Sequence, residues 1–112
     1  MNPKDQIKRL QQIAGLQLDL RLNHLHSAAR ARQESLDRIA GLNVPQARDL
    51  PPVAAAQADL LYQRWAEARR AEINHTLARQ TAEWIEAQAN ARRAFGQTQA
   101  LDAVQKKVSQ KP

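Results

Sequence analysis

Cysteine is absent from this 112-residue chain, and glycine, aromatic residues and long apolar runs are scarce. Without cysteine the chain can form no disulfide and no thiolate metal site, which fits a reducing compartment. No segment reaches the roughly 18 uninterrupted apolar residues of a membrane-spanning helix. The start, MNPKDQIKRL, lacks the apolar run of a secretory signal. We therefore expect a cytoplasmic protein with no membrane span.

The abundant residues favour helix. Ala, Arg, Gln, Leu and Glu dominate, and all five are strong helix formers. The apolar fraction comes mainly from Ala and short aliphatic residues, which suit a narrow seam between helices better than a thick core. This composition predicts an all-α protein.

Apolar residues recur at steps of three and four in two segments, which predicts helices over 4–41 and 53–108. Three prolines in LNVPQARDLPPV predict a Pro-rich turn over 42–52. Asn2 and Pro3 are typical of a helix start. A connection this short favours antiparallel return, so we expect one domain, 1–112. Its predicted fold is an antiparallel two-helix coiled-coil hairpin with a longer C-terminal helix.

The first predicted helix carries an apolar stripe that we expect to form the seam. Its steps of three, four and four between Ile7 and Leu18 predict a stutter in the heptad repeat. Ile13, Leu16 and Leu20 form a second stripe beside it, which widens the apolar face. The predicted seam positions are Ile7, Leu10, Ala14, Leu18, Leu22, Leu25, Ala29, Leu36 and Ile39.

The end of the second predicted helix lacks a partner if residue 41 faces residue 54. Residue 4 then faces about residue 91, and the helix beyond Ala91 overhangs. Phe95 is the only phenylalanine, and it lies in this overhang beside Gly96. Gly96 weakens a helix by up to about 1 kcal/mol relative to Ala and permits a bend. We interpret the two residues as a hinge and an anchor for a partner.

Aromatic and basic residues supply the other candidate contacts. We expect Trp65 to pack in the seam, whereas Trp84 fits the seam and a partner equally well. Antiparallel pairing brings basic residues from both chain ends toward one tip, in a chain of net charge +6. The predicted partner-binding residues are Lys4, Lys8, Arg9, Trp84, Arg92, Arg93, Phe95, Lys106 and Lys107.

Nothing in the sequence predicts catalysis, a cofactor or a metal. His24 and His26 lie on nearly opposite faces of a helix and cannot chelate one ion. Glu83 and Glu86 lack a further ligand. The three serines have no evident base, and no glycine-rich phosphate loop is present. These features argue against an enzyme.

The layout resembles the FliJ/YscO family of flagellar and type III secretion export stalk proteins. The likeness rests on the small, basic, Cys-free two-helix chain and on the Ala/Arg/Glu/Leu texture of LHSAARARQESLDRIAGL. It also rests on the stretch ARRAFGQTQALDAV. The resemblance implies a non-enzymatic stalk that binds the export ATPase hexamer, an export gate protein or export chaperones. It also implies a cytoplasmic location, or a peripheral one at the inner-membrane export apparatus.

Two other functions fit the sequence. A pI of about 10.5 is compatible with a small nucleic-acid-binding hairpin, although acids such as Glu67 and Glu72 around Arg69 and Arg70 would repel phosphates. The wide apolar face could instead pair two hairpins into a homodimeric four-helix bundle, as a self-associating structural module.

Overall fold

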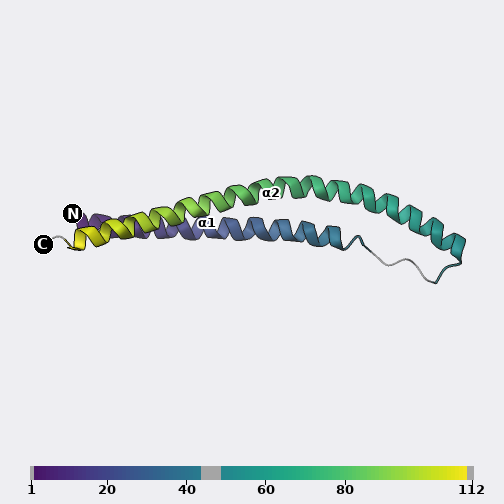
Figure 1. Cartoon of the computed structure of the whole chain (residues 1–112), viewed down its shortest axis with the longest axis horizontal. Coiled ribbons are helices and arrows are strands. Elements are labelled where there is room, and N and C mark those ends of the chain that lie inside the picture. Colours follow the sequence, from purple (N-terminus) through teal and green to yellow (C-terminus); the bar gives the residue numbers. More distant parts are fainter. Residues whose placement is uncertain (1, 44–48, 111–112) are drawn as a thin grey trace. The chain divides into compact units, whose positions relative to one another are not determined.

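The computed structural model describes residues 2–43 and 49–110, and these ranges form two long α-helices without a strand. Helix α1 spans Pro3–Ala40 and α2 spans Pro52–Gln110 (Figure 1). The predicted all-α fold of two packed helices, the second longer, is confirmed. The helix ends differ from the predicted ones by one or two residues. Residues 44–48 of the predicted Pro-rich turn lie outside the described residues.

The start of α1 is capped by its own sequence. Asn2 Oδ1 accepts a hydrogen bond from the Asp5 backbone N–H at 2.9 Å, and the Asn2 carbonyl accepts one from Gln6 at 3.1 Å. Pro3 occupies the first helical position, where its missing N–H would have no partner. In the described residues, no helix is both long and apolar enough to cross a bilayer.

The chain divides into two compact units, each built from part of both helices. Unit 1 combines Met1–Ala29 with Glu83–Pro112, and unit 2 comprises Arg30–Ala82. In unit 1 the beginning of α1 lies beside the end of α2 (Figure 1).

The seam of unit 1 follows a heptad repeat of small, aliphatic and polar side chains. On α2 its positions alternate steps of three and four, as in a coiled coil. Three alanines, Ala14, Ala91 and Ala94, are buried, which allows a close approach of the helices. The buried and half-buried heptad positions are Ile7, Gln11, Ala14, Leu18, Leu25 and Ala28 on α1, and Trp84, Ala87, Ala91, Ala94, Thr98, Leu101, Gln105 and Val108 on α2.

A polar layer sets the antiparallel register of unit 1. The Gln11 side-chain amide donates to Asp102 Oδ1 at 2.8 Å and to Gln105 Oε1 at 2.9 Å. A buried or half-buried polar group must find such partners, so any shift along the helices would lose these bonds. The layer therefore specifies which turns of α1 and α2 meet.

The predicted apolar stripe of α1 is wrong at two positions. Leu10 and Leu22 are 51% and 47% exposed, respectively, while the polar Gln11 takes the seam position beside Leu10. The steps from Ile7 to Leu18 are four, three and four, so the α1 part of unit 1 has no stutter. The hydrogen bonds of Gln11 across the seam explain why a glutamine can occupy this position.

Unit 2 has a core at the end of α1. Leu42, just beyond α1, is buried with Ala66 and Ile73 of α2, and Ile39 and Tyr62 pack against them. The Tyr62 hydroxyl donates to the Leu42 carbonyl at 2.9 Å. Thus the chain leaves α1 beside the stretch of α2 between Tyr62 and Ile73.

This placement corrects the predicted overhang. Residue 41 does not face residue 54, and within unit 2 the first turns of α2 run past the end of α1 (Figure 1). The part of α2 beyond Ala91 is paired with α1, since Ala94 is buried and Gln105 is bonded to Gln11. The prediction failed because it placed the first turn of α2 beside the end of α1, whereas Leu42 packs against Ala66 and Ile73, several turns into α2.

Polar pairs also cross the seam of unit 2. The Ser35 hydroxyl, 2% exposed, donates to Gln80 Oε1 at 2.5 Å. Arg32 Nε donates to Thr81 Oγ1 at 3.1 Å, and that hydroxyl donates in turn to the Leu77 carbonyl. Polar side chains can therefore fill heptad positions that a purely apolar pattern would miss.

Candidate functional site

A basic surface lies where α1 begins and α2 ends, within unit 1. The hydrogen bonds from Gln11 to Asp102 and Gln105 determine which turns of the two helices lie side by side. Lys8 lies less than one turn before Gln11 on α1, and Lys107 lies less than one turn after Gln105 on α2. The two lysines are therefore at the same level along the paired helices. The predicted convergence of these two basic groups therefore agrees with the register of unit 1.

The basic end, as we call this surface, has an excess of cations that are all exposed. Among residues 2–12 and 102–110 the acids are Asp5 and Asp102, and Asp102 accepts the hydrogen bond from Gln11. Such a surface attracts acidic partners and speeds their association more than it sets affinity. The cations of the basic end are Lys4, Lys8, Arg9, Lys106 and Lys107.

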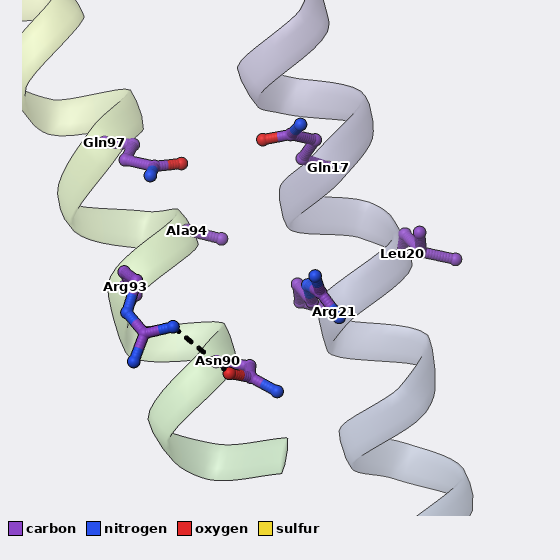
Figure 2. Close-up of a pocket in the computed structure, with 7 residues that line it drawn as sticks. All are labelled: Gln17, Leu20, Arg21, Asn90, Arg93, Ala94 and Gln97. Atoms are coloured by element: carbon purple, nitrogen blue, oxygen red, sulfur yellow. Dashed lines mark hydrogen bonds between the residues drawn. The ribbon is translucent and has the colours of Figure 1, made fainter. Parts of the chain in front are cut away.

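Arg92 and Arg93 lie elsewhere, contrary to the expectation that they share the tip. A recess between the two helices of unit 1 is lined by Arg93 of α2 and by Gln17 and Arg21 of α1 (Figure 2). Lys106 is 13 residues further along α2 than Arg93. That separation is about 20 Å at 1.5 Å per residue. The two arginines therefore belong to the middle of unit 1.

Phe95 is exposed, as expected, but not because α1 has ended. Its side chain is 52% exposed, while its neighbour Ala94 is buried in the seam. Phe95 falls one residue past the seam position of the heptad, so it projects from the side of the paired helices. Its carbonyl accepts a hydrogen bond from Thr98 Oγ1 at 2.7 Å.

The helix continues without a break through Gly96. Its φ angle is not positive, and a methyl group added there would meet no atom within 4 Å. Gly96→Ala is therefore expected to raise the free energy of unfolding by about 0.5–1 kcal/mol, through the greater helix propensity of Ala. Urea unfolding followed by circular dichroism measures this gain. Gly41→Ala is the control, since Gly41 lies outside α1 and the helix propensity of Ala brings no gain there. A loss of stability in Gly96→Ala would contradict the expectation.

The two tryptophans lie in different environments. Trp84 is half-buried at a seam position of unit 1. Trp65 is 56% exposed, so its predicted packing in the seam is wrong. Its ring lies 5.7 Å from that of Tyr62, at an angle of 41°. Ala66 takes the seam position beside Trp65 and is almost fully buried, because a small side chain fits between close helices.

Arg21 lines the same recess as Arg93, and the apolar pattern did not predict this role for it. Arg21 stands at a heptad position of α1 between Leu18 and Leu25 yet is exposed. Reading the four-three repeat strictly from Ile7, with polar residues allowed, would have found it.

Within the described ranges, no group of three or more His, Asp or Glu side chains is placed to hold a metal ion.

Comparison with known proteins gives no neighbour: no family model, no curated protein and no solved structure matches the chain. A proposal for the function therefore rests on the arrangement of charges and exposed side chains.

Proposed function

We propose that this chain is a non-enzymatic stalk protein of a flagellar or type III export apparatus. It binds the export ATPase hexamer through the basic end and works in the cytoplasm beside the inner-membrane apparatus. An export gate protein or export chaperones are further partners. The resemblance described above motivates the choice of system.

The observation that carries the proposal is the basic end itself. The beginning of α1 meets the end of α2 at the Gln11 layer, where Gln11 and Asp102 are 91 residues apart in sequence. Together these two segments present five exposed cations against two acids. Long-range attraction of this kind would guide the end of the two helices toward an acidic or polar ring opening. The exposed surface of the two helices outside the basic end is then available to other partners.

Neutralising the basic end tests the proposal. Lys8→Gln/Lys107→Gln is expected to weaken binding to the cognate export ATPase about tenfold at low salt, since two surface charges contribute roughly 0.5–1 kcal/mol each. The loss should shrink as salt rises. Titration of the purified ATPase by biolayer interferometry at low and at high salt measures the affinity loss and its dependence on salt.

The matched control is Arg38→Gln/Arg64→Gln, which removes two exposed cations from unit 2. Its affinity for the ATPase should equal that of the original chain. Equal affinity in the Lys8/Lys107 variant would refute the assignment of the basic end. No binding by any of the three proteins would refute the proposed ATPase partner.

A further inference from the structure

The seam of unit 1 opens into a polar recess midway along the paired helices. Gln17 and Gln97 point toward each other across it, and the methyl group of Ala94 points at α1 (Figure 2). The exposed Arg21 stands where an apolar side chain would close the heptad layer. The recess has a volume of about 190 Å³, and its lining residues are Gln17, Leu20, Arg21, Asn90, Arg93, Ala94 and Gln97.

The lining is positive and rich in donors, and it contains no acid. Two guanidinium groups, of Arg21 and Arg93, come from the two helices. Within the described residues, Arg93 Nη1 makes only a long contact of 3.5 Å with Asn90 Oδ1. Across residues 2–43 and 49–110, Arg21 has no hydrogen bond or ion pair. Guanidinium groups bind carboxylates by paired, charge-assisted hydrogen bonds, so the recess complements a carboxylate.

An exposed apolar strip begins at the edge of the recess. Leu20 borders the recess and points away from α2 (Figure 2). Ile13 and Leu16 precede it at steps that keep one face of α1, and both are at least 49% exposed. Leu10, 51% exposed, extends the strip by one more turn. A contiguous apolar strip beside polar residues is typical of a protein-binding surface.

We infer that this face of unit 1 docks an amphipathic helix of a partner protein. The apolar side of that helix covers the strip from Leu10 to Leu20, which is about 15 Å long and matches three helical turns. An Asp or Glu carboxylate of the same helix enters the recess between Arg21 and Arg93. The inference rests on the proposed function only in treating the chain as an interaction protein, and it specifies the chemistry of one partner.

Both features of the face are needed to choose this occupant. A free phosphate or other small anion would satisfy the arginines but leave the apolar strip uncovered. A purely apolar helix would cover the strip but leave two unpaired guanidinium groups at its edge, and burying these would cost free energy. A helix with a carboxylate next to its apolar face satisfies both.

Display of helical 18-residue peptides tests the inference. The peptides share a Leu stripe and differ at one position beside it, which is Glu, Asp, Gln, Ser or Lys. The full-length chain is the bait. We expect enrichment of Glu or Asp at least tenfold over Gln, and loss of that preference with Arg21→Gln/Arg93→Gln as bait. Arg38→Gln/Arg64→Gln, of equal charge and located in unit 2, should keep the preference.

Other outcomes decide against the inference. Absence of an acidic preference, or an equal one with the Arg21/Arg93 variant, would overturn the carboxylate site. Self-association of the full-length chain in sedimentation, abolished by Arg21→Gln/Arg93→Gln and without peptide enrichment, would assign the face to a second copy instead. Neither outcome involves the export ATPase, so each is distinguishable from a failure of the proposed function.

Discussion

Ile73→Ala is expected to lower the free energy of unfolding by about 2–4 kcal/mol. Ile73 is 6% exposed and packs with Leu42 and Ala66 in the core of unit 2. Removing three carbons there leaves a cavity that Ile39 and Tyr62 can fill only in part. The loss is a large share of the roughly 5–15 kcal/mol that holds an ordinary domain together. Urea unfolding followed by circular dichroism measures it.

Leu61→Ala is the matched control for Ile73→Ala. Leu61 lies on the same helix and in the same unit, but 66% of it is exposed. Its truncation should change stability by no more than about 0.5 kcal/mol. Losses of similar size in the two variants would show that the core at Leu42 does not hold unit 2 together.

Ala14→Leu/Ala91→Leu should destabilise the chain by about 1–3 kcal/mol for each substitution. Both alanines are buried at seam positions of unit 1, one on each helix, with 7% and 6% of their surface exposed. A leucine at either site forces the helices apart or into a strained rotamer, because the seam is built around small side chains. Thermal and urea unfolding both report the loss.

Ala89→Leu/Ala100→Leu is the control for overpacking of the seam. These alanines lie on α2 in unit 1 and are exposed, so leucine there should leave stability within about 0.5 kcal/mol. If the Ala14/Ala91 variant were instead more stable than the original chain, the seam of unit 1 would have to be wider than the burial of these alanines implies.

The helices and their ends were predictable because their signals are local. Helix propensity, the Asn2 cap and the prolines act within a few residues of one another, and the observed bounds differ from the predicted ones by at most two residues. The seam was predicted less well. Leu10 and Trp65 are large and apolar yet exposed, whereas Gln11 and Ser35 are polar and lie in the seam. Hydrophobicity alone assigns all four to the wrong side.

The candidate site was predicted in part. Lys4, Lys8, Lys106 and Lys107 were assigned to one end on the basis of antiparallel pairing, which does not depend on the details of register. Arg93 and the supposed overhang do depend on register. They were misplaced because the sequence does not say how far the chain travels between the helices.

By itself, the sequence determined that the chain forms two helices, the second longer, with a net positive charge and small seam residues. These properties follow from composition and from contacts within a few residues. Only the tertiary structure decided which turns face one another. Hydrogen bonds between distant side chains, such as Gln11 with Gln105 and Ser35 with Gln80, choose the register. That choice pairs the end of α2 with α1 and places Arg21 and Arg93 at one recess, because polar groups in a seam are stable only beside their partners.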